Sequence, residues 1–270
     1  MADYYEGMAR PKRKCAFCDA WATTKGEHLW DDWINKELPK KTRFNAQKTL
    51  TLNAAPIEFE TVGLKEKLPV VCAKCNGGWM SALTAKVKKR FSESVVDGKP
   101  FSLDARDASL LVAYTFLKAS VKDYCYSREP FFTRAERESL RTSLVVPPVM
   151  SVWFAAHLSA ARYTFHSNVN IVSAGDPGPL RGMKFFCYTY IIGRLVLQLL
   201  APGWENPLDR ARPLVSLNPG NFWVPAATQF WPYLGKVLSW PPENFFGDDT
   251  IEQFFYRFRM SVEVPITILY

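Results

Sequence analysis

The sequence predicts an α+β protein that contains a metal-binding module, and three observations carry this prediction. Two Cys-x-x-Cys pairs, Cys15–Cys18 and Cys72–Cys75, lie in the first hundred residues. Apolar residues recur at helical spacing between positions 104 and 124, whereas they alternate with other residues between 151 and 200. The first spacing is typical of a buried helix and the second of strands in an antiparallel sheet.

A turn-forming sequence, Asp97-Gly98-Lys99-Pro100, separates two parts of the chain. We expect residues 1–99 to form a small metal-stabilised module. Residues 100–270 are expected to form a larger α+β domain with an antiparallel sheet, serving recognition, sensing or oligomerisation. The formal net charge is +8, and most of the excess lies in residues 1–99. Such a charge suits a polyanionic partner such as nucleic acid, and a solvated basic surface is the alternative.

Two features of the sequence argue against a signal peptide and a membrane-spanning segment. The start of the chain, residues 1–6, lacks the cationic and apolar regions of a signal peptide. The most apolar run, residues 185–201, is interrupted by Arg194. We therefore expect a soluble cytoplasmic protein, in which Cys-x-x-Cys pairs more often hold a metal than form disulfides. Cys125 and Cys187 have no partner nearby in the sequence and are expected to be reduced core residues.

The four paired cysteines are the candidate ligands of a structural zinc ion. Two residues between thiolates allow both sulfurs to reach one ion from a tight turn, and two such pairs complete a tetrahedral Zn²⁺ site. A site closed by four sulfurs has no open position for substrate, so this zinc would stabilise the fold without taking part in catalysis. The candidate ligands are Cys15, Cys18, Cys72 and Cys75.

A second group of residues offers chemistry for hydrolysis. Glu27-His28 is expected to end a strand that leads into a short helix, and Asn76 directly follows the second cysteine pair. The pKa of a histidine, about 6.5, suits a general base, so His28 is the candidate base. Glu27 and Asn76 offer the oxygen ligands that a catalytic Mg²⁺ or Mn²⁺ prefers. Asp31 and Asp32 fit either of two roles, capping the short helix or binding a metal, and capping is preferred.

Basic residues flank both cysteine pairs and are the candidate contacts to substrate phosphates. One group lies in the arm before the first pair, and the other lies on the polar side of a helix predicted from Trp79 to Phe91. A solubilising terminus and a solvated helix face are the corresponding structural explanations. The six candidates are Lys12, Arg13, Lys14, Lys86, Lys89 and Arg90.

The remaining elements follow from capping signals and periodicity. Asp104 can cap a helix that runs to Tyr124, and Thr133-Arg134-Ala135-Glu136 is a capping box that opens another. Residues 36–67 are polar and are expected to carry at most a short hairpin. The other expectations are strands at 68–72, 151–158, 161–172, 183–191 and 195–200, a turn or bulge at 192–194, an irregular wrap at 202–242 and a helix at 248–258.

The sequences CAFC, EH and VVCAKCNGGW together resemble the HNH nuclease superfamily, in the branch whose ββα-metal core is stapled by two Cys-x-x-Cys zinc knuckles. The resemblance covers about residues 10–92. It implies that His28 is the general base and that Glu27 and Asn76 are ligands of the catalytic metal. The chain departs from the family pattern in having Glu27 where aspartate is more usual and no asparagine in residues 64–69.

The resemblance implies a metal-dependent endonuclease that hydrolyses phosphodiester bonds, with DNA as the expected substrate. Small nuclease modules joined to a second domain are common in bacterial and phage conflict systems, so a role in defence or in a mobile element is also implied. The C-terminal domain would then be the place for a homo-oligomer or protein contact. Two alternatives stay open: a non-catalytic zinc-knuckle module that binds nucleic acid or protein, and a structural protein in which zinc only stabilises the fold.

Overall fold

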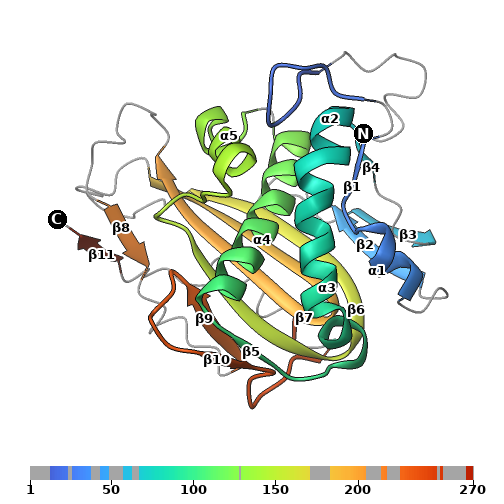
Figure 1. Cartoon of the computed structure of the whole chain (residues 1–270), viewed down its shortest axis with the longest axis vertical. Coiled ribbons are helices and arrows are strands. Elements are labelled where there is room, and N and C mark those ends of the chain that lie inside the picture. Colours follow the sequence, from blue (N-terminus) through green and yellow to red (C-terminus); the bar gives the residue numbers. More distant parts are fainter. Residues whose placement is uncertain are drawn as a thin grey trace.

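The structure combines helices with antiparallel sheets, which confirms the predicted α+β class (Figure 1). Among the helices of the described residues, none has both the length and the apolar character needed to cross a bilayer. The computed structural model describes residues 13–23, 26–37, 43–48, 57–62, 67–127, 129–170, 183–204, 214–217, 226–247, 250–251 and 266–269.

The largest sheet has three antiparallel strands in the order β7-β6-β9. The sequence predicts four separate strands here, but they are joined into two long ones. In the second long strand, the turn or bulge expected at residues 192–194 is a bulge, so the strand continues through it. The pairing shifts between Ala156 and Ala161, opposite Gly193, whose φ of 61° is left-handed. A Cβ atom at Gly193 would lie 2.0 Å from the Val95 carbonyl oxygen, so only glycine fits. The strands are β6 (Ser151–Asn170), β7 (Met183–Trp204) and β9 (Ala227–Trp231).

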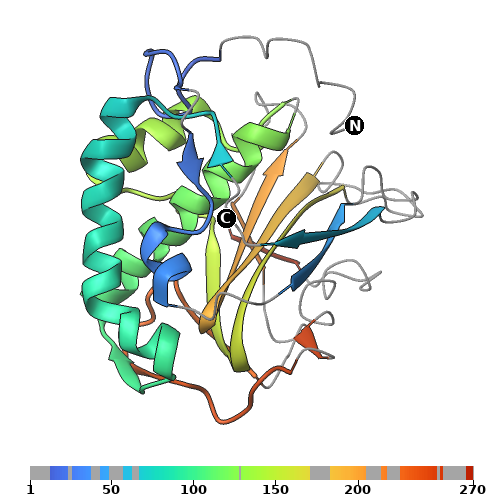
Figure 2. The same cartoon turned by 90° about the vertical axis from the view of Figure 1, so that its right-hand side faces the viewer.

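Three helices lie on one face of this sheet, namely α3 (Ser81–Asp97), α4 (Ala105–Tyr126) and α5 (Arg134–Ser143) (Figure 2). The caps that the sequence predicts for α4 and α5 are present. The Asp104 side chain accepts a hydrogen bond from the backbone of Asp107, and Thr133 with Glu136 forms the capping box. Helix α3 is longer than expected and ends at Gly98, which takes the left-handed conformation typical of helix ends.

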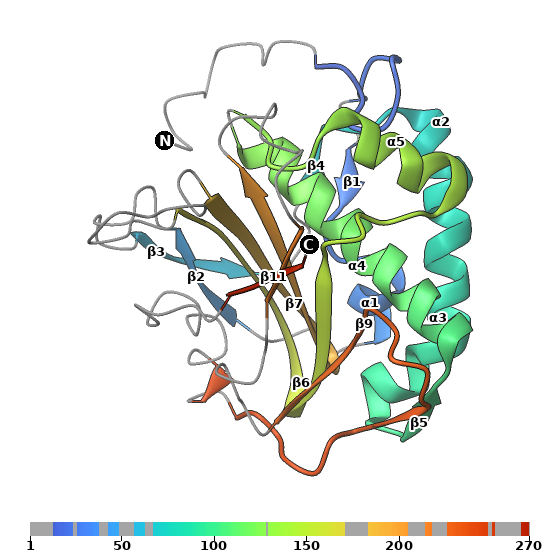
Figure 3. The same cartoon turned by 90° about the vertical axis from the view of Figure 1, so that its left-hand side faces the viewer.

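Small two-stranded sheets complete the described fold. The hairpin expected within residues 36–67 is present, and it lies on the side of the long sheet away from α3 and α4 (Figures 2 and 3). The pairs are β1 (Glu27–His28) with β4 (Lys67–Leu68), β2 (Arg43–Lys48) with β3 (Ile57–Val62), β5 (Phe101–Leu103) with β10 (Leu238–Trp240), and β8 (Leu214–Leu217) with β11 (Ile266–Leu269). Short helical segments are α1 (Asp32–Glu37), α2 (Ala73–Cys75) and a π-helical turn, η2 (Asn76–Met80).

Two sequence expectations differ from these elements, and a third is not covered. The strand expected at 68–72 is limited to Lys67–Leu68, since β1 offers only two residues to pair with. The stretch 202–242 is not wholly irregular, because it contains β8, β9 and β10, and Phe230 and Trp240 pack into the core. The helix expected at 248–258 falls almost entirely outside the described residues.

The hydrophobic core crosses the predicted boundary between residues 99 and 100. It includes residues from Cys15 to Trp240. At the boundary itself, Phe101 contacts Phe91 of α3 at a ring distance of 5.0 Å and stacks on Trp240 at 5.2 Å. The two stretches thus share one core, and whether either part folds alone stays a prediction.

Candidate functional site

The four paired cysteines come together as the sequence predicts. Their sulfur atoms all lie within 4.8 Å of one another. The Cys18 Sγ is 3.6 Å from that of Cys72 and 3.7 Å from that of Cys75. A tetrahedral Zn²⁺ with Zn–S distances of about 2.3 Å requires sulfur–sulfur separations of about 3.8 Å. All six cysteines are free thiols, so this cluster could hold one structural metal ion of the size and preference of zinc.

Backbone hydrogen bonds join the two cysteine loops directly. The Ala16 amide donates to the Val70 carbonyl at 2.8 Å, and the Thr23 amide donates to the Val71 carbonyl at 2.9 Å. From α5, the buried guanidinium of Arg137 donates to the Ala16 carbonyl at 2.8 Å. The cluster is therefore held by the first loop, the second loop and a helix from beyond residue 100.

The environment treats the four thiols differently. Burial raises the pKa of Cys15. Burial acts in the same direction on Cys72, but a hydrogen bond from the Cys75 amide and contacts with neighbouring thiols outweigh it and lower the pKa of Cys72. Because a metal binds the thiolate form, the lowered pKa favours the binding form of Cys72.

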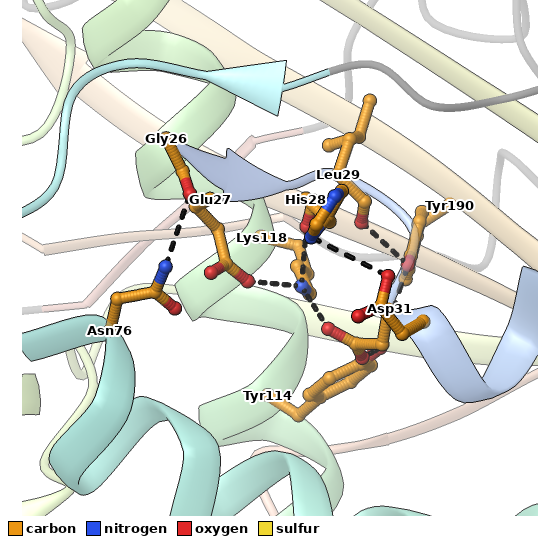
Figure 4. A network of polar contacts seen from close by, with 10 residues as sticks. Gly26, Glu27, His28, Leu29, Asp31, Asn76, Tyr114, Lys118 and Tyr190 are labelled. Atoms are coloured by element: carbon orange, nitrogen blue, oxygen red, sulfur yellow. Dashed lines mark hydrogen bonds and ion pairs between the residues drawn. The ribbon is translucent and has the colours of Figure 1, made fainter. Parts of the chain in front are cut away.

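The candidate catalytic residues also converge, from segments far apart in the sequence. Glu27 and His28 form β1, which pairs with β4 just before the second cysteine loop. The Asn76 amide Nδ2 donates to the Gly26 carbonyl at 3.1 Å and so lies beside β1 (Figure 4). Gly26 has a left-handed φ of 64°, and a Cβ atom there would meet the Leu68 backbone at 2.9 Å, so the close approach of the two strands requires glycine.

His28 is half-buried and faces a carboxylate. Its Nδ1 lies 3.6 Å from Oδ1 of Asp32, at the start of α1, and its side chain is 29% exposed. The strand ends at His28 and the helix begins at Asp32, so the turn between them brings the two side chains together. A carboxylate on one ring nitrogen leaves the other, Nε2, as the nitrogen available to accept a proton.

A buried cation that the sequence reading missed lies at the centre of this site. The Lys118 ammonium, from α4, is 2.8 Å from Oε1 of Glu27 and 2.6 Å from Oδ1 of Asp31. Asp31 also accepts a hydrogen bond from the Tyr114 hydroxyl at 2.6 Å. Asp31 directly precedes α1, where a cap would lie, and both of its carboxylate oxygens contact residues of α4, so its capping of α1 stays a prediction.

Hydrogen bonds already engage part of the ligand set that the resemblance implies for a catalytic cation. Lys118 occupies Oε1 of Glu27, and among the described residues no partner is recorded for Oε2 of Glu27 or for Oδ1 of Asn76. Mg²⁺ often takes only one or two protein oxygens and completes its shell with water and phosphate oxygens. The one four-residue metal cluster found among the described residues is that of the cysteines, so a cation at Glu27 and Asn76 stays a prediction.

Some of the candidate phosphate-binding side chains already contact other protein groups, and others are exposed to solvent. Arg13 donates to the carbonyls of Tyr124 and Cys125 at 3.3 Å, and Arg90 forms an ion pair with Asp107 at 2.7 Å. Both thus have structural contacts. The Lys14 ammonium lies 4.0 Å from the ring centre of the exposed Trp21. Lys86 and Lys89 are exposed on α3, and Lys12 lies outside the described residues.

No protein-family model matches the chain, and no curated protein or solved structure is significantly similar to it.

Proposed function

We propose that the chain is a metal-dependent endonuclease of the HNH type that hydrolyses phosphodiester bonds of DNA. The observation that carries the proposal is that Asn76, directly after a four-cysteine cluster, hydrogen-bonds to the Gly26 carbonyl at the start of the strand that bears Glu27 and His28. Their supporting elements follow the order that the family resemblance implies: a strand with the acid–histidine pair, an antiparallel second strand, then a helix that begins near the asparagine.

In this proposal His28 is the general base. Its Nε2 takes a proton from the attacking water, and the Asp32 carboxylate near Nδ1 stabilises the imidazolium that forms. Glu27 and Asn76 hold a divalent cation, which when bound supplies positive charge to the phosphate and leaving oxygen. The cysteine cluster fixes the loop before Asn76 and takes no part in the chemistry.

The substrate is a polyanion, and exposed cations on α3 and in the first cysteine loop suit it. Lys86 and Lys89 project from α3, the helix that follows Asn76, while Lys14 lies beside the first cysteine. The net charge of +8 favours the approach of DNA over long distances at low ionic strength.

A second candidate is a non-catalytic module that binds nucleic acid through its cysteine loops. One observation favours it: the Lys118 ammonium already neutralises the Glu27 carboxylate that a catalytic cation would use. The two candidates differ in whether DNA is cut when a divalent cation is added.

We expect the purified protein to nick supercoiled plasmid in Mg²⁺ or Mn²⁺ and to lose that activity in EDTA. Asn76→Ala should need more Mg²⁺ for the same rate, because one oxygen ligand is lost. Asn76→Asp is the matched control, since both variants lose the hydrogen bond to the Gly26 carbonyl and only Asn76→Ala loses the oxygen ligand.

Plasmid conversion is measured over a Mg²⁺ titration, with zinc content checked in every sample so that loss of the structural ion is not mistaken for loss of the catalytic one. Equal nicking with and without EDTA would contradict the proposed metal dependence. An unchanged Mg²⁺ requirement in Asn76→Ala would contradict the role of Asn76 as a metal ligand.

A further inference from the structure

Lys118 is a fully buried cation whose hydrogen-bonding capacity is used completely. It lies on α4 with no exposed surface. Its ammonium contacts Oε1 of Glu27 at 2.8 Å, Oδ1 of Asp31 at 2.6 Å and the His28 carbonyl at 3.1 Å. An ammonium has three N–H donors, so each donor has one acceptor, and all three acceptors belong to β1 and the turn after it.

The network is charged and rigidly supported. Burial alone would lower the pKa of Lys118, but the carboxylates of Asp31 and Glu27 outweigh burial and raise it, so the side chain is an ammonium ion. Asp31 is anchored in turn by the buried Tyr114 hydroxyl, and the Tyr190 hydroxyl of β7 donates to the Leu29 carbonyl at 2.9 Å. The carboxylates of Glu27 and Asp31 with the ammonium of Lys118 have a formal net charge of −1, which favours the binding of a cation.

Lys118 limits what Glu27 can offer to that cation. Figure 4 shows the Glu27 carboxylate between Asn76 on one side and Lys118 on the other. Oε1 accepts the hydrogen bond from Lys118, so Oε2 is the oxygen of Glu27 that has no partner among the described residues and is the more open to a metal. The amide nitrogen of Asn76 is likewise committed to Gly26, which leaves its Oδ1.

This restriction bears on which cation fits. Ca²⁺ takes six to eight oxygen ligands and often binds both oxygens of a carboxylate, whereas Mg²⁺ takes six ligands, keeps several waters and uses single carboxylate oxygens. A site that presents one oxygen from Glu27 and one from Asn76 suits the smaller ion better.

We propose that Lys118 is a positioning residue that holds Glu27 as a one-oxygen ligand and thereby makes the site select Mg²⁺ or Mn²⁺ over Ca²⁺. The inference rests on the proposed function, because it assumes that Glu27 and Asn76 bind the catalytic cation. It adds that a residue of α4, outside the stretch that resembles the nuclease family, sets the metal preference.

The test is cation binding to the zinc-loaded protein, measured without substrate by Mn²⁺ electron paramagnetic resonance with Ca²⁺ competition. The wild-type chain should bind Mn²⁺ at least about tenfold more tightly than Ca²⁺. The double variant Lys118→Met/Asp31→Asn removes one positive and one negative charge and frees Oε1 of Glu27. Its Mn²⁺ affinity should fall by about 10–100-fold, the usual effect of removing a group that orients a ligand. Its Ca²⁺ affinity should fall less, so the ratio of Mn²⁺ affinity to Ca²⁺ affinity should be smaller than in the wild-type chain.

Tyr114→Phe is the control, because it disturbs Asp31 but leaves Lys118 on Glu27 and should keep the wild-type preference. A double variant with an unchanged Mn²⁺/Ca²⁺ ratio, or a wild-type chain that binds both ions equally, would overturn the role of Lys118. A wild-type chain that binds no Mn²⁺ beyond the zinc site would also overturn it, and would remove the metal part of the proposed function as well.

Discussion

Replacing Lys118 with methionine is expected to lower the free energy of unfolding by about 3–5 kcal/mol, the usual cost of breaking a buried ion pair by removing one partner. The variant leaves the carboxylates of Glu27 and Asp31 buried without their cation. The pKa of Lys118 is raised above its ordinary value, so its stabilising effect is complete below pH of about 10.4 and is lost as the pH rises further through the raised value.

Denaturant unfolding of the wild-type and variant chains measures this loss. Lys88→Met is the matched control, since Lys88 forms an exposed ion pair with Glu37 on the surface of α3 and should contribute less than about 1 kcal/mol. Adding Asp31→Asn to Lys118→Met should recover part of the stability, because one unpaired carboxylate disappears. If Lys118→Met and Lys88→Met lower stability equally, the buried network does not hold the site together.

Replacing Cys72 with serine is expected to abolish the structural metal site and loosen both cysteine loops. The Cys72 sulfur lies 3.6 Å from that of Cys18 and also accepts the Cys75 amide hydrogen bond that starts the helix. Structural zinc sites contribute on the order of 10 kcal/mol of folding free energy, so losing one ligand has a large effect. Asn76 follows this loop directly, and its contact with Gly26 should be lost as well.

Metal analysis and thermal unfolding test this expectation together. The wild-type chain should carry one zinc ion, and Cys72→Ser should carry much less and melt at a lower temperature. Cys125→Ser is the control, because Cys125 lies outside the cluster and should leave the zinc content unchanged. A wild-type protein purified under reducing conditions without zinc would contradict the assignment.

Local signals in the sequence were enough to predict much of the fold. The caps at Asp104 and Thr133 depend on contacts within a few residues, and the structure confirms both. The cysteine cluster was predictable because two Cys-x-x-Cys pairs in one chain are typical of a zinc site, and the four sulfurs do come together. The bulge at Gly193 was marked by a glycine within an apolar run.

The buried network was not predicted, because it depends on contacts between residues distant in the sequence. Asp31 has the local signature of a helix cap, yet its partners are on α4. A signal for Lys118 was present: it falls on the apolar stripe of its helix, with Tyr114 one turn and Leu111 two turns before it. A lysine at such a position needs a buried acid, and Glu27 and Asp31 were the candidates.

The sequence patterns also did not predict that one hydrophobic core includes residues on both sides of position 100. The predicted break is present at this point, because α3 ends at Asp97 and Gly98 caps it in the left-handed conformation. Nothing local reveals that Phe101, just after this break, packs back against Phe91. Contacts such as these, and the bond from Arg137 to Ala16, tie the metal cluster to the rest of the fold.

The central claim is that His28 is the general base, and the cleavage rate of His28→Ala tests it most directly. Removing a general base typically lowers the rate by about 10²–10⁴-fold. His28 is partly exposed and meets Asp32 only at an ion-pair distance, so its loss should leave folding and zinc content nearly intact. Plasmid nicking, melting temperature and bound zinc are measured on the same preparation. A large fall in rate with unchanged stability and zinc content is the predicted result, whereas a folded, zinc-loaded variant that cleaves at the wild-type rate would contradict the role of His28.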